Sequence, residues 1–315
     1  MDYRKLGKTD LDVAPLAFGG NVFGWTLDET AAFRLLDEMV DVGLNFIDTA
    51  DVYSSWVPGN QGGESETILG RWFKKGGKRK HIVLATKVGS EMAPDQKGLS
   101  KAYIRKAIEA SLRRLQTDYI DLYQAHLDDP ATPLEETLSA FDQLVREGKV
   151  RAIGASNYSA ARLSEALAVS KENALVGYAT IQPLYNLYDR ADFEADLAPT
   201  CEEKGIVAIS YFSLASGFLS GKYRSAADLV GHARGGMVGK YLDPRGLRIL
   251  SALDEVANAL GSTPATVALG WLMKRPAVAV PIASATSSAQ LKALIAATEL
   301  RLSQAEMDYL TEASA

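Results

Sequence analysis

The stretch that organises this chain is Asn45-Phe46-Ile47-Asp48-Thr49-Ala50-Asp51-Val52-Tyr53. It begins as a short apolar run typical of a buried strand, and a carboxylate and a phenol come at its end and just after it. Two similar runs, 82–85 and 120–123, are followed by Lys87 and His126. Four ionisable groups of different types at the ends of buried strands predict an active site, because each is otherwise a poor choice for such a position.

Strand-length apolar runs alternate with amphipathic helical stretches along the whole chain. Eight candidate strands lie at 16–18, 45–48, 82–87, 120–126, 152–156, 179–182, 206–210 and 278–282. Clear helices are predicted at 28–42, 100–115, 133–147, 159–170 and 191–204, and residues 245–274 read as two helices divided at 261–264. The alternation has no linker or shift in composition, which predicts a single domain over residues 1–315. The expected fold is an α/β (β/α)8 TIM barrel rather than a doubly wound sheet.

Further features are expected around this barrel. Residues 1–15 precede the first unit and carry turn residues at 6–10, which predicts a small hairpin capping the barrel floor, and one of the two helices in 245–274 would be an extra helix outside the repeat. Long stretches after strands, 52–63, 88–99 and 211–243, would lie on the face where such barrels keep their chemistry. Residues 231–239 are expected to be the most mobile part.

Composition narrows the classes of partner. Lys and Arg number 34 and Asp and Glu 39 among the 315 residues, which gives a net charge of −5, and no basic patch stands out, so nucleic acid is not an expected partner. The start lacks the apolar core of a signal peptide and no window approaches the roughly 18 apolar residues of a membrane span, so we predict a cytoplasmic protein with no membrane partner. The one cysteine and three histidines show no metal-ligand spacing, and no metal is expected.

Several motifs in order resemble those of one family. The stretch 45–53, followed by Gly63-Glu64-Ser65-Glu66 and Leu69-Gly70, resembles the signature of the aldo-keto reductases. Further matches are Ala85-Thr86-Lys87-Val88, Gln124-Ala125-His126-Leu127-Asp128, the run 148–157 and Gln182-Pro183-Leu184-Tyr185-Asn186. The resemblance covers nearly the whole chain. It implies reversible, NAD(P)H-dependent reduction of an aldehyde or ketone to the alcohol.

The four ionisable residues fit that chemistry. Adding hydride to a carbonyl leaves an alkoxide, so a proton donor must meet the oxygen as charge develops. Tyr53 is the predicted donor, and the ammonium of Lys87 is expected to lower the pKa of the phenol from its ordinary value near ~10. Following the resemblance, Asp48 would balance the charge of Lys87, and His126 would hydrogen-bond the carbonyl oxygen.

The resemblance also assigns cofactor contacts. Ser156, Asn157 and Gln182 match positions that hold the nicotinamide carboxamide, and Tyr211 matches the aromatic residue that stacks on the nicotinamide ring. The pyrophosphate strap would comprise Phe212, Ser213, Leu214, Gly217, Leu219 and Lys222, and an adenosine 2′-phosphate would meet Ser284, Thr286, Ser287 and Gln290. Relatives that bind NADPH tightly usually carry Lys or Arg in that last segment, and this chain has none there. NADP(H) is the predicted cofactor, with NAD(H) as the alternative.

The substrate pocket is expected to be bounded by Asn21, Phe23, Trp25, Trp56 and the 88–99 loop. Its two tryptophans suit aldehydes, ring-bearing ketones or sugars, so the pocket names no physiological substrate. Neither the oligomeric state nor the physiological direction follows from the sequence. Two other functions stay open: a nucleotide-binding, redox-sensing or structural subunit, as in channel-associated members of the family, and an aldolase-type barrel using Lys87 as a Schiff-base amine.

Overall fold

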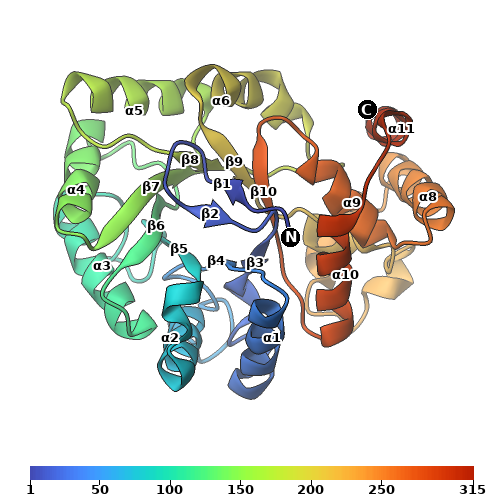
Figure 1. Ribbon diagram of the computed structural model, residues 1–315, viewed down its shortest axis with the longest axis horizontal. Coiled ribbons are helices and arrows are strands. Elements are labelled where there is room, and N and C mark those ends of the chain that lie inside the picture. The colour runs from blue at the N-terminus through green and yellow to red at the C-terminus, as the bar shows by residue number, and fades with distance from the viewer.

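The computed structural model describes all 315 residues and is built around a closed barrel of eight parallel strands in the order β10-β3-β4-β5-β6-β7-β8-β9 (Figure 1). The strands are β3 Ala17–Gly19, β4 Phe46–Asp48, β5 Val83–Val88, β6 Ile120–Ala125, β7 Val150–Ser156, β8 Thr180–Gln182, β9 Val207–Ser210 and β10 Val278–Ala283. Each one overlaps its predicted segment. The predicted (β/α)8 TIM barrel is therefore confirmed.

Helices surround the barrel on its outer side (Figure 1). They are α1 Glu29–Asp41, α2 Glu64–Gly76, α3 Lys101–Leu115, α4 Leu134–Arg146, α5 Ala160–Glu172, α6 Ala198–Lys204, α8 Pro244–Ala259, α9 Pro264–Met273, α10 Ser288–Glu299 and α11 Gln304–Ala313, with a single short turn, α7 Gly235–Val238. Side chains of Asp28, Ser100 and Ser159 accept a backbone N–H at the start of α1, α3 and α5. Such caps fix where these helices begin.

One predicted helix is corrected by the structure. The segment 191–204 contains a π-helical stretch, Phe193–Leu197, before α6. Pro199 is the second residue of α6, and because proline lacks an N–H and clashes with the carbonyl four residues earlier, the regular α-helical hydrogen bonding cannot pass through it. The predicted division of 245–274 into two helices is confirmed, since α8 ends at Ala259 and α9 begins at Pro264.

A two-stranded antiparallel hairpin, β1 Arg4–Lys5 and β2 Asp12–Val13, lies across one end of the barrel (Figure 1). Its Leu6 and Leu11 are buried in a cluster that includes Phe46 and Ala279, near the amino ends of barrel strands. The hairpin thus closes the floor of the barrel as expected. The opposite end, where the strands have their carboxyl ends, stays uncovered by it. No helix in the structure combines the length and apolar character that crossing a membrane requires.

Candidate active site

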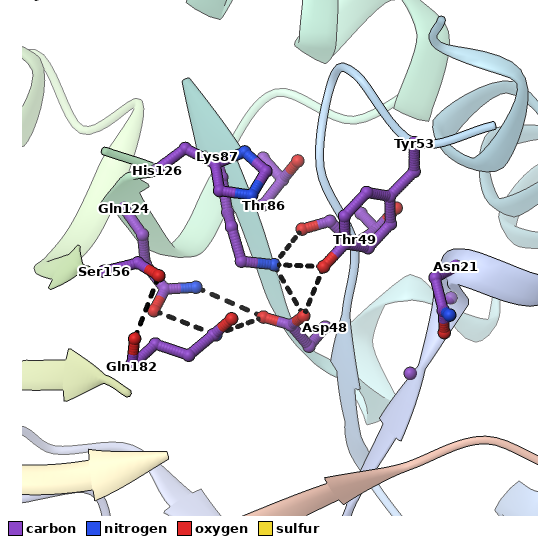
Figure 2. Close-up of polar contacts among 12 residues, drawn as sticks. Asn21, Asp48, Thr49, Tyr53, Thr86, Lys87, Gln124, His126, Ser156 and Gln182 are labelled. Atoms are coloured by element: carbon purple, nitrogen blue, oxygen red, sulfur yellow. Dashed lines mark hydrogen bonds and ion pairs between the residues drawn. The ribbon is translucent and has the colours of Figure 1, made fainter. Parts of the chain in front are cut away.

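The register of the strands brings polar side chains to one rim. Asp48 ends β4, Lys87 on β5 is paired with Gln124 on β6, and Ser156 on β7 is paired with Gln182 on β8. In a parallel barrel the carboxyl ends of all strands meet at the same face. Figure 2 shows these side chains converging there.

Lys87 lies at the centre of this cluster and is fully buried. Its Nζ donates to Asp48 Oδ2 at 2.6 Å, to the backbone oxygen of Thr49 at 2.9 Å and to the phenol oxygen of Tyr53 at 2.9 Å (Figure 2). An ammonium has three donors, and all three are used. Burial lowers the pKa of Lys87, whereas the adjacent Asp48 carboxylate opposes that shift. A buried charge of this kind persists only when paired and fully hydrogen-bonded.

The second oxygen of Asp48 is held by two amides. Gln182 Nε2 donates to Asp48 Oδ1 at 2.8 Å, and Gln124 Nε2 donates to the same atom at 3.2 Å. Gln124 was not selected from the sequence. Its only signal is its position two residues before His126 on a buried strand, which turns it into the barrel. Gln182 was expected to bind the nicotinamide carboxamide, but here its amide nitrogen donates to the Asp48 carboxylate.

Tyr53 is carried by a constrained loop after β4. Ser54 has a left-handed backbone with φ of 72° and its hydroxyl donates to Phe23 O at 2.7 Å, while Asn60 Nδ2 donates to Ser54 O at 3.0 Å. The phenol oxygen accepts from Lys87 and lies 3.4 Å from Asp48 Oδ2. A residue outside the strands is thereby placed over the lysine.

The expectation that Lys87 would lower the pKa of Tyr53 is wrong. Burial of the phenol, followed by the charge of Asp48, holds the pKa of Tyr53 well above its ordinary value. A phenolate would meet both a dry site and a neighbouring carboxylate, which together outweigh the ammonium. Tyr53 is therefore a protonated phenol at neutral pH, which is the form that can give a proton.

His126 follows β6 and faces the same phenol. The two rings are 6.1 Å apart between centroids, and the backbone N–H of His126 is fixed by Val88 O at 2.8 Å. Burial, reinforced by the charge of Lys87, lowers the pKa of His126 to about 3. The imidazole is neutral, and its buried Nδ1 has no hydrogen-bond partner within the protein. Because Nδ1 is enclosed, Nε2 is the ring nitrogen that remains for a ligand.

The four ionisable residues that the sequence indicated therefore lie together at one rim of a TIM barrel. The chain matches the Aldo/keto reductase family over residues 15–315. The protein belongs to the aldo/keto reductase family. The resemblance found in the motifs is therefore confirmed. Members of this family are oxidoreductases that act on small carbonyl compounds and generally use nicotinamide cofactors.

Individual relatives cover nearly the full length. YrpG of Bacillus subtilis (strain 168), named an uncharacterized oxidoreductase, is 36% identical over 321 residues, 99% of this chain and 95% of YrpG. The aldo-keto reductase YhdN of the same organism is 34% identical over 305 residues, 93% of this chain and 88% of YhdN. A probable voltage-gated potassium channel subunit beta of Arabidopsis thaliana is 35% identical over 301 residues, 93% of this chain and 89% of that protein.

Asp51 is a buried acid that lies behind the reductase's rim cluster. It is 2% exposed, and its Oδ1 has no hydrogen-bond partner. The carboxylate of the neighbouring acid Glu66 is paired, since it accepts from Arg114 Nε at 2.7 Å and Thr86 Oγ1 at 2.6 Å, but it keeps its negative charge. Burial, followed by the charge of Glu66, raises the pKa of Asp51 to about 8, although Arg114 and Lys87 oppose this.

Asp51→Asn is expected to stabilise the fold, more strongly at pH 9 than at pH 5. The pKa of Asp51 rises from 3.8 to about 8 on folding, so the folded state holds a proton that the unfolded state has lost. Stability therefore falls as the pH rises from about 4 to about 8, by an amount on the order of a few kcal/mol, and the amide removes this loss. Thermal unfolding of wild type and Asp51→Asn at both pH values measures this difference in stability. Asp95→Asn, an exposed acid, is the control, and an equal effect of the two variants would contradict the assignment.

Three of the family's expected carboxamide contacts form a linked group next to His126. Asn157 has a left-handed backbone with φ of 59°, its Nδ2 donates to His126 O at 2.9 Å, and its Oδ1 accepts from the Tyr211 hydroxyl at 2.8 Å. The Ser156 hydroxyl donates to Gln182 O at 2.9 Å. These donors and acceptors are of the types that an amide-bearing ring needs, but they are bonded within the protein and would have to exchange partners to hold one.

The segment expected to strap over the pyrophosphate adopts an unusual backbone. Phe212, Ala215, Ser216 and Gly217 all have positive φ, from 48° to 101°. Such turns can present N–H groups to an anion, and Lys222 stays exposed beside them. Ser213 and Leu219 are buried, with the Ser213 hydroxyl donating to Ser210 O at 3.0 Å. Those two anchor the strap instead of facing a ligand, and Leu214 packs partly buried against the core.

The segment expected at the 2′-phosphate lies at the start of α10. Thr286 N donates to Gln290 Oε1 at 2.8 Å, and Gln290 N donates to Ser287 Oγ at 3.3 Å. The Ser284 hydroxyl lies 2.8 Å from Gly19 O and 2.7 Å from Asn21 Oδ1. The hydroxyls and amides proposed for a phosphate are thus already bonded within the protein, and they would have to exchange partners to hold one.

The expected substrate residues separate into two groups. Trp25 and Trp56 make an edge contact at 5.7 Å between ring centroids, and Trp56 lies 6.0 Å from Tyr53. Phe23 is fully buried and stacked on Phe18 at 5.8 Å, so the expectation that it lines the pocket is corrected: it is a core residue. Asn21 lies apart from the lysine cluster in Figure 2. The aromatic rim therefore consists of the two tryptophans.

No group of three or more His, Cys, Asp or Glu side chains is arranged to hold a metal ion. Cys201 is buried in α6, and burial raises the pKa of its thiol to about 12.

Proposed function

We propose that this protein reduces an aldehyde or ketone to the alcohol, reversibly, with Tyr53 as the proton donor. The observation that carries the proposal is the position of the Tyr53 hydroxyl, which accepts from Lys87 at 2.9 Å above the buried Lys87 and Asp48 ion pair. Such an arrangement supplies an acid at the place where a carbonyl oxygen would gain negative charge.

Each residue has a defined task in this proposal. A bound nicotinamide supplies the hydride. As the Tyr53 hydroxyl gives its proton to the carbonyl oxygen, the phenol oxygen gains negative charge and its hydrogen bond from Lys87 strengthens. Asp48 keeps Lys87 charged and oriented, and the amides of Gln124 and Gln182 keep Asp48 in place. In the reverse direction the same hydroxyl oxygen would take the proton back.

We propose that His126 positions the carbonyl. A neutral imidazole carries one N–H and one acceptor nitrogen, and here Nε2 makes no hydrogen bond within the protein while Nδ1 is enclosed. It can therefore donate to the substrate oxygen without adding a second positive charge next to Lys87. This task also fixes which face of the carbonyl receives hydride.

The proposed cofactor is NADP(H), with NAD(H) as the alternative. The carboxamide would be held by Ser156 and Asn157, with Tyr211 against the ring, and the 2′-phosphate by the donors at the start of α10. A helix N-terminus contributes only about 0.3 to 1 kcal/mol to an exposed anion. Discrimination against NAD(H) should accordingly be modest.

Thr286→Arg is expected to tighten NADPH binding by roughly tenfold or more and to leave NADH binding unchanged. A charge-assisted hydrogen bond contributes roughly 1.5 to 3 kcal/mol, and NADH has no 2′-phosphate to accept it. Dissociation constants for both cofactors, from quenching of intrinsic fluorescence, provide the measurement, with Thr286→Met as the uncharged control. If wild type binds NADH as tightly as NADPH, the preference fails. If arginine alters both equally, this segment does not contact the 2′ position.

The alternative of a cofactor-binding subunit without turnover rests on the relative named as a potassium channel subunit beta. A nitrobenzaldehyde added to wild type and NADPH separates the two functions. The carbonyl reductase oxidises NADPH in proportion to the alcohol formed, whereas a binding subunit holds the cofactor with negligible oxidation. The aldolase alternative is less favoured because all three donors of Lys87 are engaged, and borohydride trapping with a carbonyl compound should yield no adduct.

A further inference from the structure

Arg234 is a cation next to the aromatic rim. It lies in the long connection between β9 and α8, immediately before α7, and it is partly buried. Its guanidinium carbon is 5.2 Å from the centre of the Trp25 ring. Trp25 contacts Trp56, and Trp56 contacts the proton donor Tyr53. Three consecutive contacts therefore connect this arginine to the reacting end of the site.

The guanidinium of Arg234 has no acceptor in the protein: no hydrogen bond or ion pair joins it to a carboxylate or carbonyl. Every other partly buried arginine has such a partner, and these are Arg4, Arg79, Arg114, Arg162, Arg190, Arg245 and Arg275. Arg234 is thus the exception in a molecule that otherwise pairs its partly buried guanidinium groups.

Acidic residues that lie in the connection between β9 and α8, or are bonded to it, have other partners. Asp228 accepts from the backbone of Arg224 and Ser225, and Asp254 holds the Arg224 guanidinium at 2.7 Å. Asp243 caps α8, and Asp189 accepts from the Tyr241 hydroxyl at 2.7 Å. No carboxylate of the long connection is therefore left to neutralise Arg234.

We infer that Arg234 binds an anionic group on the substrate, so that the preferred substrates of this site are aldehydes or ketones that also carry a carboxylate. The inference rests on the proposed carbonyl reduction and names its substrate class. Trp25 covers one face of the guanidinium, and the N–H groups around the edge of that plane are the ones that meet a carboxylate in a bidentate pair.

Charge favours the same conclusion. Burial lowers the pKa of Arg234, and Tyr223 opposes that shift. The cation has therefore lost part of its hydration without gaining an anion as partner. An uncompensated, partly buried charge is costly, so a bound carboxylate regains interaction energy that the free protein lacks. A neutral substrate of equal shape would leave that charge unpaired.

A cofactor phosphate is the other source of an anion for Arg234. The contacts favour a substrate anion as the ligand of Arg234. The guanidinium contacts Trp25, Trp25 contacts Trp56, and Trp56 contacts Tyr53. The 2′-phosphate segment at the start of α10 and the strap over 212–222 make no hydrogen bond or ion pair with the guanidinium, although α7 packs against the strap. The experiment therefore measures cofactor binding as a separate arm.

The test compares two aldehydes of nearly equal size, 4-carboxybenzaldehyde and 4-nitrobenzaldehyde, in wild type, Arg234→Met and Arg234→Lys. Arg34→Met is the matched control, since Arg34 is an exposed arginine on α1 without a hydrogen bond. The readouts are kcat and KM for each aldehyde and the Kd of NADPH. The Kd of 4-carboxybenzaldehyde with NADP⁺ present, from tryptophan fluorescence quenching, tests the anion site even without turnover.

We expect Arg234→Met to raise KM and Kd for 4-carboxybenzaldehyde by about tenfold or more, the usual worth of a charge-assisted bond, with 4-nitrobenzaldehyde and NADPH nearly unchanged. Arg234→Lys should recover part of the loss, and Arg34→Met should match wild type. Equal losses for both aldehydes, no loss, or a weakened Kd for NADPH alone would overturn the inference. If wild type binds 4-carboxybenzaldehyde but reduces neither aldehyde, the proposed function fails while the anion site stands.

Discussion

Tyr53→Phe is expected to lower kcat for aldehyde reduction by at least ~100-fold, because the substitution deletes the proton donor and leaves the aromatic ring in place. The Kd of NADPH should be nearly unchanged, since no proposed cofactor contact involves this hydroxyl. Steady-state oxidation of NADPH with 4-nitrobenzaldehyde and a separate binding titration provide the two readouts.

Tyr119→Phe is a matched control for that variant. Tyr119 precedes β6 near the closed end of the barrel, and its hydroxyl makes no hydrogen bond, so its loss should not change turnover. Retention of more than about a tenth of wild-type turnover by Tyr53→Phe would remove the phenol from the role of acid, because a positioned acid contributes at least ~10²-fold.

Lys87→Met is expected to abolish turnover and to destabilise the fold. The variant removes the hydrogen bond that would stabilise the developing phenolate, and it also leaves the Asp48 carboxylate buried without its cation. Breaking a buried ion pair from one side typically costs about 3 to 5 kcal/mol. Turnover and the free energy of unfolding in urea should both be measured, because the two losses have different causes.

The double variant Asp48→Asn with Lys87→Met distinguishes those causes. With neither charge present, much of the lost stability should return, since no isolated ion remains buried. Turnover should stay absent, because the phenol has no cation beside it. Recovery of turnover in the double variant would show that Lys87 acts only by stabilising the fold.

The barrel could be predicted because its signal is distributed over the whole chain. Eight apolar runs alternate with capped amphipathic helices, and each strand formed within or next to its expected segment. The π-helical stretch at 193–197 could not be read from periodicity, because five residues are too few to show a change in apolar spacing. Proline at 199 was its one visible cause.

The site was predictable where side-chain chemistry is unusual for a strand end. Lys87 and Asp48 stand out because charges rarely follow buried runs without a partner. Gln124 does not stand out, since a neutral amide on a strand has no distinctive sequence signal, yet it holds Asp48 Oδ1. Arg234 was missed for another reason: its isolation depends on where the carboxylates of a long connection fold, which sequence does not state.

The protonation of Tyr53 required the structure. Sequence places an ammonium beside the phenol and so predicts a lowered pKa. The structure adds burial and the carboxylate of Asp48, 3.4 Å from the phenol oxygen, and these raise the pKa. The sign of the shift depends on distances and burial that no motif contains.

The most direct test of the central claim is transfer of deuterium from NADPH carrying deuterium at both positions of nicotinamide C4 to 4-nitrobenzaldehyde in the wild-type protein. The alcohol is isolated and its mass measured. The account predicts one deuterium per alcohol, bonded to the former carbonyl carbon, and formation of alcohol equal to the NADPH oxidised. Alcohol without deuterium, or no alcohol despite binding of the cofactor, would contradict it.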